Sequence, residues 1–415
     1  PRSRPNDARP QRTCARVGGA ATVGGMSAQE PSAQPAEPQQ NNQPADHKPV
    51  QINMQDLLEA VQSLGKKTVQ QQDEAAAKAA QYDEAILDSS AIEPTDSEGN
   101  PIPVTIPIVL APNITVVYTT RLGGASTDEW AHFNLGGKSG DVPDHVRANR
   151  DALANELHAK LSLINQVHSG DAIDIDARFE PNRSFGFDAS GTQEAAPVDD
   201  VESVDGTVQI IEGDAQVSTQ TGIALGVFAA DCLPVLLADP VSGVIAAAHC
   251  GRKGLMEGVI GSTVEMMKAK GADPAHILAT LGPAICGDCY ETGDEIADAF
   301  DAKFPGTFTL TRFGGPGIDI NKAALMALEQ AGVSASHIYS SQPRVNAATQ
   351  YLAQDAELEQ LCREDNEGDP QLDERIKHIR HSMCTLENPL WFSHRRAQLA
   401  HKAHEGRMLA LIVRH

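Results

Sequence analysis

The chain has little of several features that would place it in a specialised class of protein. It contains no run of about 18 apolar residues, the length that a membrane-spanning helix needs. Aromatic residues make up 4% of the chain, and its 33 basic residues face 56 acidic ones, so the formal net charge is −23. A charge of that sign opposes general binding to nucleic acid or to an anionic membrane surface. We therefore expect neither partner, and any phosphate site must be local.

Cysteine is also scarce, with seven residues spread over a chain of 415. An odd and dispersed set is not typical of a disulfide framework, so we expect a reducing compartment, the cytoplasm. The first 25 residues are rich in Arg but lack the apolar core of a secretory signal. We expect translation to begin at Met26.

Two changes in composition divide the chain. Residues 26–50 are rich in Gln, Pro, Ala and Asn, and they cannot bury enough apolar surface to offset their ordering entropy. Residues 53–88 are strong helix formers with a sparse apolar stripe, which predicts one or two exposed helices. A β-rich body begins near Pro101. We predict a disordered and helical extension over residues 1–100 and a catalytic domain over residues 101–415.

The body mixes strand and helix patterns. Period-two or apolar runs predict strands, including a strand pair over residues 160–176 that holds His168 at its bend. Amphipathic runs predict helices over residues 142–157, 255–271 and 318–333. Residues 177–201 and 340–383 are polar and charged, which indicates surface insertions, the second of them helical. We predict an α+β fold in which mixed β-sheets pack with helices.

We place the chemistry in residues 227–254. Two apolar runs there flank the sequence DPVSG, which predicts a β-hairpin. A turn centred on its Pro-Val pair would put Cys232 directly opposite His249, with Cβ atoms about 4.5–5.5 Å apart. The same register would put Asp231 opposite Cys250. A thiolate and an imidazole so placed can share a metal ion or act as nucleophile and base, although a buried core pair is the plainer alternative.

Two shorter motifs follow the hairpin. The sequence GRKG leads into a predicted helix, whose first N–H groups favour anions. Cys286 and Cys289 form a C-x-x-C, which is a weak metal or redox signal by itself. Because no second pair lies at the spacing of a zinc ribbon, we expect a structural role for these two cysteines.

With these motifs assembled, residues 104–413 resemble the YfiH/laccase-domain family of purine nucleoside phosphorylases, also known as the multicopper polyphenol oxidase-like or DUF152 group. The resemblance rests on separate motifs in order: TTRLGG, FNLG, NQVHSGD, AADCLPVLLAD, AAHCGRKG, LGPAICGDCYE, and CT followed by FSHRR. It implies a zinc site formed by His168, Cys232 and His249. The family usually has Gly-Trp-Arg-Gly after the second His, so this chain keeps a cation as Lys253 and loses the aromatic residue.

The resemblance also implies an activity. The reactions are phosphorolysis of adenosine, inosine and 5′-methylthioadenosine, together with deamination of adenosine. Two His and one Cys leave a fourth zinc position open, and water activated there could attack C6 of the purine. The catalytic candidates are Asp231 for proton transfer, Cys232 and His249. The candidates for binding phosphate or nucleoside, each of which could instead be structural, are Arg121, Asn134, Lys253 and Arg395.

The expected partners are therefore purine nucleosides and phosphate, and we expect a monomer or a homodimer. Other functions stay open. A copper polyphenol oxidase would need grouped H-x-H pairs, which the sequence lacks, although copper itself can bind an N/S site. A thiol hydrolase acting on an amide or a cell-wall precursor would use Cys232 and His249, and it would need His168 only weakly. A non-catalytic scaffold, docked through the N-terminal helices, would turn over no nucleoside.

Overall fold

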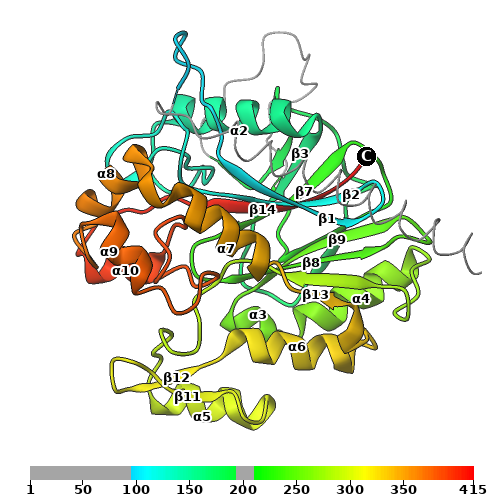
Figure 1. Ribbon diagram of the computed structural model, residues 1–415. Helices are drawn as coiled ribbons and strands as arrows, with labels where there is room; N and C mark the ends of the chain where they lie inside the picture. Colours follow the sequence, from blue (N-terminus) through cyan, green and yellow to red (C-terminus); the bar gives the residue numbers. More distant parts are fainter. Residues whose placement is uncertain (1–94, 193–209) are drawn as a thin grey trace, which may run out of the picture. The chain divides into compact units, whose positions relative to one another are not determined.

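The computed structural model describes residues 95–192 and 210–415. The predicted disordered segment 26–50, the predicted helices of 53–88 and residues 193–201 of the first insertion lie outside the described residues. Within those described, two six-stranded sheets carry helices on their outer faces, as Figure 1 shows. The predicted α+β fold of mixed sheets packed with helices is confirmed. None of the described helices is long and apolar enough to cross a membrane.

The first sheet contains the first and the last strand of the described chain. In spatial order its strands are β1 (Thr105–Ala111), β2 (Ile114–Thr119), β14 (Met408–Arg414), β7 (Ile223–Ala229), β3 (Lys160–Ile164) and β5 (Gly186–Ala189). The central strands β14 and β7 are almost continuously apolar and buried, as expected for strands covered on both faces. β5 is a buried strand that pairs with β3, so residues 186–189 of the predicted surface insertion belong to the core instead.

The second sheet packs face to face with the first. Its strands, in spatial order, are β13 (Ile338–Tyr339), β10 (Leu278–Leu281), β8 (Leu233–Asp239), β9 (Val244–Cys250), β6 (Ala215–Ser218) and β4 (Ala172–Asp174). Side chains from both sheets, such as Val116, Leu225 and Leu236, share one buried cluster. A small ribbon of β11 (Phe308–Leu310) and β12 (Pro316–Ile318) lies outside both sheets.

Helices cover the two outer faces. α2 (Pro143–Leu157) buries Leu153 and Leu157 against the first sheet, and it agrees with the helix predicted over 142–157. The second sheet is covered by α3 (Arg252–Glu257), α4 (Val259–Ala269) and α6 (Ile320–Gln330), whereas α5 (Asp294–Lys303) lies against the β11–β12 ribbon, as Figure 1 shows. The helix predicted over 255–271 is broken at Gly258, whose φ of 87° ends α3 and begins α4.

The second predicted insertion is helical. It contains α7 (Gln342–Tyr351), α8 (Ala356–Glu364), α9 (Leu372–Lys377) and the 3₁₀ turn η3 (Leu352–Gln354), and α10 (His394–Leu399) follows it. Two other 3₁₀ turns are η1 (Asp128–Trp130) and η2 (Ala335–His337). Leu358, Leu361 and Cys362 of the insertion lie in the cluster between the sheets, so this segment completes the core as well as covering it.

The hairpin of β8 and β9 is present, but its register differs from the predicted one. Pro234, not Cys232, lies opposite His249, and Leu233 lies opposite Cys250. The turn is longer than predicted because the Asp239 carboxylate accepts hydrogen bonds from the N–H groups of the second and third turn residues, at 2.8 and 3.3 Å. The shift is two residues, so Cys232 and His249 keep the same face although they are not directly opposed.

The two strands predicted over residues 160–176 are present, but they do not pair with each other. β3 belongs to the first sheet and β4 to the second, so they do not form a hairpin. The connection between them crosses from one sheet to the other, and His168 lies in that crossing.

Candidate functional site

The three predicted metal ligands meet where the chain passes between the two sheets. His168 lies between β3 and β4, Cys232 lies between β7 and β8, and His249 is the penultimate residue of β9. One ligand atom from each residue lies within 4.8 Å of the others. The Cys232 sulfur is 3.9 Å from His168 Nε2, and the two imidazole centroids are 4.9 Å apart. The fold therefore brings together residues that are far apart in the sequence.

The backbone at this point is unusual. His168 and Asp231 have φ values of 63° and 87°, in the left-handed region that residues other than glycine rarely adopt. Such conformations cost free energy and cluster at functional sites, where the surrounding structure holds them. Here they turn both crossing loops so that His168 and Cys232 face His249.

Asp214, which precedes β6, holds this arrangement together and was missed in the sequence. Its Oδ1 is 2.8 Å from His249 Nδ1, and its side chain is fully buried. The same carboxylate accepts hydrogen bonds from the backbone N–H groups of Val167, His168 and Ser169 at 3.2, 3.0 and 2.6 Å. One carboxylate thus orients one imidazole ligand and fixes the loop that carries the other.

The electrostatics of the three groups are coupled. Burial by itself would raise the pKa of Cys232, but the neighbouring His249 and His168 outweigh it and lower that pKa to about 6. Burial would likewise lower the pKa of His249, yet the Cys232 thiolate and the Asp214 carboxylate raise it to about 9. Both shifts act in the same direction, because each charged group stabilises the other, so the pair favours a Cys232 thiolate beside a His249 imidazolium.

The donor set and the space around it fit a metal ion. Because Asp214 occupies His249 Nδ1, the Nε2 atom is the one free to coordinate. Gly251 lies directly against the cluster, and a Cβ there would come within 2.9 Å of the Cys232 sulfur and 3.2 Å of His168 Cδ2. A side chain at position 251 would therefore fill the cradle. Two imidazoles and a thiolate suit Zn²⁺ and also suit copper.

The three residues line a cavity of about 470 Å³. Asp231 and Arg395, which were predicted from the sequence, lie in the same wall. Further polar residues of the wall were not predicted, and these are Lys138, Ser139, Asn165, Gln166, Ser190, Tyr290, His394 and Arg407. The cavity therefore combines three candidate metal ligands with several cations, a combination that suits an anionic or phosphate-bearing ligand.

Asp231 and Arg395 are held by each other and by their neighbours. Asp231 accepts hydrogen bonds from Thr385 Oγ1 and from the backbone N–H of Arg395, both at 2.6 Å. The Arg395 guanidinium donates to the carbonyl of Glu291 at 2.9 Å and lies 5.8 Å from the Tyr290 ring centre. α10 therefore presents a fixed cation, and the Asp231 carboxylate beside it, to the cavity.

Arg121 is not in this cavity. Its guanidinium is buried and donates to both oxygens of Asp365, at 2.7 and 2.9 Å, and to the carbonyl of Pro389 at 2.6 Å. Arg375 and Arg396 also contact Asp365, at 3.1 and 3.3 Å. Arg121 therefore joins the core to the helical insertion and is not placed to bind a ligand of the cavity.

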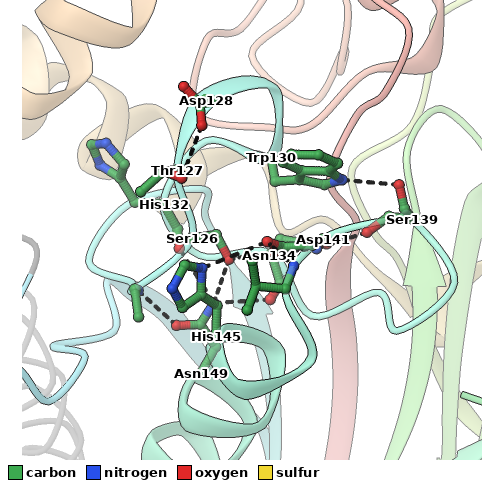
Figure 2. Close-up of polar contacts among 12 residues, drawn as sticks. Ser126, Thr127, Asp128, Trp130, His132, Asn134, Ser139, Asp141, His145 and Asn149 are labelled. Carbon is green, nitrogen blue, oxygen red and sulfur yellow. Dashed lines mark hydrogen bonds and ion pairs between the residues drawn. The ribbon is translucent and has the colours of Figure 1, made fainter. Parts of the chain in front are cut away.

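Asn134 lies behind the residues that line the cavity and contacts several of them. Its amide oxygen accepts from the N–H groups of Gly136 and Arg407, both at 2.9 Å. Its amide nitrogen donates to Ser139 and Asp141 at 2.8 and 2.9 Å, and Figure 2 shows these side chains around it. Because Asn134 is fully buried, it is placed to shape the glycine loop 136–139 and does not line the cavity itself.

Lys253 is the second residue of α3, and its side chain is exposed. It is not among the residues that line the cavity. The helix turns this side chain outward, so the cation that the sequence motif retains does not lie beside the metal ligands. Arg395 is the better placed of the predicted cations to bind an anion there.

Comparisons with known proteins show the family of this chain. A family model described as multi-copper polyphenol oxidoreductase laccase matches residues 115–415. A purine nucleoside phosphorylase of Streptomyces coelicolor is 40% identical over 219 residues, which are 52% of this chain and 80% of that protein. An adenosine deaminase from an unknown prokaryotic organism is 34% identical over 232 residues, 54% of this chain and 81% of that protein.

A solved structure has the same fold. The YfiH protein of Bacillus licheniformis superimposes with a TM-score of 0.52 at 24% identity, and the match covers 73% of this chain and 93% of the YfiH chain. The two-sheet architecture described above is therefore shared with that protein.

Proposed function

Since this chain belongs to the multi-copper polyphenol oxidoreductase laccase family, we propose that it is a zinc-dependent purine nucleoside phosphorylase. The proposed substrates are adenosine, inosine and 5′-methylthioadenosine, and adenosine is also deaminated. The observation that carries the proposal is the meeting of His168, Cys232 and His249 in the wall of a cavity that also presents Arg395. The names of the relatives, a purine nucleoside phosphorylase and an adenosine deaminase, support the substrate class.

The three ligands would hold the metal, with His249 oriented by Asp214. A bound zinc ion would supply Lewis acidity, which polarises a substrate oxygen or nitrogen and makes a water molecule more acidic. The chain itself keeps the ligands in place through the Asp214 hydrogen bonds and the space beside Gly251. Copper also fits the donor set, and we favour zinc because three ligands with one open position are typical of catalytic zinc.

In phosphorolysis, a phosphate oxygen forms a bond to C1′ of the ribose while the bond from C1′ to the purine nitrogen breaks. The products are ribose 1-phosphate and the free base, which must gain a proton. We assign phosphate binding to Arg395, since its guanidinium is held in the cavity wall and can form paired hydrogen bonds to phosphate oxygens. Holding the two reactants in one cavity supplies much of the rate by orientation.

In deamination, water adds at C6 of adenosine and ammonia leaves. Asp231 is the carboxylate of the wall that we assign to proton transfer, taking a proton from the attacking water and returning it to the leaving amine. Its two hydrogen bonds, from Thr385 and from the Arg395 N–H, fix its orientation toward the cavity. Fixed orientation is what general acid–base catalysis requires of such a group.

The test is to incubate purified protein with each nucleoside, with and without phosphate, and to separate the products. We expect free base and ribose 1-phosphate from inosine only when phosphate is present, and inosine from adenosine without it. His168→Ala, Cys232→Ala and His249→Ala should each abolish both reactions and lower the metal content, whereas the exposed control His276→Ala should change neither. A Cys232→Ala variant with full metal content and activity would contradict the proposal.

One observation favours a second candidate. Cys232, His249 and Asp214 have the order of contacts of a nucleophile, its base and an orienting carboxylate, and the pKa of Cys232 is lowered to about 6. A thiol hydrolase of this kind would cleave an amide, lose activity on alkylation of Cys232, and keep activity in chelator. It would also tolerate His168→Ala. Loss of activity in both the chelator and the His168→Ala variant would reject it.

A further inference from the structure

A second group of metal-ligating side chains lies apart from the three residues of the cavity. Cys286 and Cys289 follow β10, and Cys384 and Glu387 precede α10. One ligand atom from each of the four lies within 4.8 Å of all the others. The C-x-x-C motif thus has a partner motif, C-x-x-E, 98 residues further along the chain. Sequence spacing alone gave no reason to join them.

Three of the four side chains are buried, Cys286 is half-buried, and their ligand atoms face one another. Cys289 and Cys384 have exposed fractions of 0% and 1%, and Glu387 has 6%. Glu387 Oε2 accepts hydrogen bonds from the backbone N–H groups of Arg380 and His381 at 2.9 and 2.8 Å. These bonds turn Oε1 toward the sulfurs, where it lies 3.6 Å from the Cys289 sulfur. The backbone N–H of Cys286 lies 3.4 Å from the Cys384 sulfur.

We propose that Cys286, Cys289, Cys384 and Glu387 form a second, structural site for one zinc ion. Tetrahedral zinc with Zn–S bonds of about 2.3 Å needs ligand atoms about 3.8 Å apart, so ligands within 4.8 Å of one another need only a small contraction. Three thiolates select a thiophilic ion, and four protein ligands close the site to water. The three thiols release their protons to solvent when the ion binds.

The surroundings suit a site with net negative charge. Three thiolates and one carboxylate carry four negative charges, of which the ion cancels two. The Arg312 guanidinium and the His381 imidazole lie 3.5 and 3.7 Å from the two Glu387 oxygens. Such outer partners orient a ligating carboxylate and offset its charge. A disulfide between two of the cysteines would leave only one thiol and the Glu387 carboxylate as possible ligands, too few for a closed site.

The proposed ion would fasten one wall of the cavity. Ala284 and Cys384 form a β-bridge, and the Thr385 N–H donates to the Ala284 carbonyl at 3.1 Å. Thr385 Oγ1 in turn donates to Asp231, and the Ile285 N–H donates to the Asp231 carbonyl at 3.0 Å. The ion would therefore cross-link the two segments that hold Asp231. This inference does not depend on the proposed reaction.

The test uses the full-length double variant His168→Ala/His249→Ala, whose metal content reports the second site alone. We expect about one equivalent of zinc by elemental analysis of this variant. Adding Cys384→Ser should remove that zinc, whereas adding Cys362→Ser, a buried cysteine outside both groups, should leave it in place. The comparison separates this site from the cavity site, because loss of zinc at one leaves the other measurable.

A second measurement covers variants that fail to fold. The metal-free double variant is titrated with Co²⁺ while sulfur-to-cobalt charge-transfer absorption is recorded, and we expect saturation at one equivalent with the band shape of a tetrahedral thiolate site. The double variant containing no zinc and developing no such band would overturn the proposal. So would a disulfide among Cys286, Cys289 and Cys384 in freshly purified protein, detected as a two-dalton mass loss.

Discussion

Replacing Asp214 by Asn changes the group that connects both imidazole ligands without changing its shape. Asp214 Oδ1 lies 2.8 Å from His249 Nδ1 and accepts from the His168 N–H at 3.0 Å. Oδ2 accepts from the N–H and the hydroxyl of Ser169, at 2.6 and 2.9 Å. The amide nitrogen of Asn is a donor and cannot accept a hydrogen bond. Whether this nitrogen takes the place of Oδ1 or of Oδ2, a backbone N–H of the His168 loop loses its acceptor.

The size of the effect follows from these contacts. A buried N–H without its acceptor costs about 1–3 kcal/mol of unfolding free energy. Removing the carboxylate behind a metal-bound histidine typically weakens metal binding about 10- to 100-fold, which is about 1.4–2.7 kcal/mol. We therefore expect Asp214→Asn to lower zinc affinity at the cavity site by about that factor and to lower the unfolding free energy in the metal-free protein as well.

Competition with a chromophoric chelator measures the affinity, and urea denaturation of the metal-free protein measures the stability. Asp171→Asn is the matched control, because Asp171 carries the same charge, lies on the loop of His168 between β3 and β4, and has an exposed side chain. Wild-type zinc affinity in Asp214→Asn would refute the reasoning. An equal loss in Asp171→Asn would show that net charge, not the hydrogen bonds of Asp214, sets the affinity.

Three further predictions follow from single contacts. Arg395→Ala should raise the phosphate KM of inosine cleavage about 10- to 100-fold, because it removes a charge-assisted hydrogen bond of about 1.5–3 kcal/mol. Lys253→Ala should leave that KM near the wild-type value, and equal effects of the two variants would contradict the assignment of phosphate binding to Arg395. Gly251→Ala should weaken zinc binding, because the added Cβ would lie 2.9 Å from the Cys232 sulfur. Gly261→Ala should leave zinc binding unchanged, since a Cβ there has no neighbour within 4 Å, and chelator competition measures both affinities. Asp365→Asn should lower the unfolding free energy by about 3–5 kcal/mol, since it leaves buried guanidinium groups uncompensated, and a loss below about 1 kcal/mol in urea denaturation would contradict this. Burial alone would raise the pKa of Asp365, but the surrounding guanidinium groups hold that pKa well below its ordinary value. The stability that the Asp365 carboxylate contributes should therefore be present above the ordinary pKa and be lost as the pH falls through the depressed pKa of the folded protein.

The fold and part of the site could be predicted because local signals carry them. Pro143 near the start of α2 and the apolar spacing of that helix predict it nearly to its ends. The β8–β9 hairpin followed from its turn sequence, although the side chain of Asp239 lengthened the turn by two residues. A register shift of two residues leaves each side chain on the same face of the strand. The predicted register was wrong, but it still placed Cys232 and His249 on the same face of the hairpin.

The remaining parts depend on long-range contacts that no local pattern reveals. Asp214 meets His249 only because β6 pairs with β9, and its sequence neighbours give no sign of that contact. Cys384 and Glu387 reach the C-x-x-C motif across 98 residues. Arg121 and Arg395 cannot be told apart by residue type, and only the position of Asp365 makes the first of them a buried structural cation.

We propose that this cavity transfers the ribose of a purine nucleoside to phosphate. The most direct measurement is the amount of ribose 1-phosphate formed for each hypoxanthine released when zinc-loaded protein is incubated with inosine and phosphate. We predict a ratio of one to one, with no hypoxanthine released when phosphate is omitted or when His249→Ala replaces the wild type. Free ribose in place of ribose 1-phosphate, or release of hypoxanthine at the same rate without phosphate, would contradict the claim.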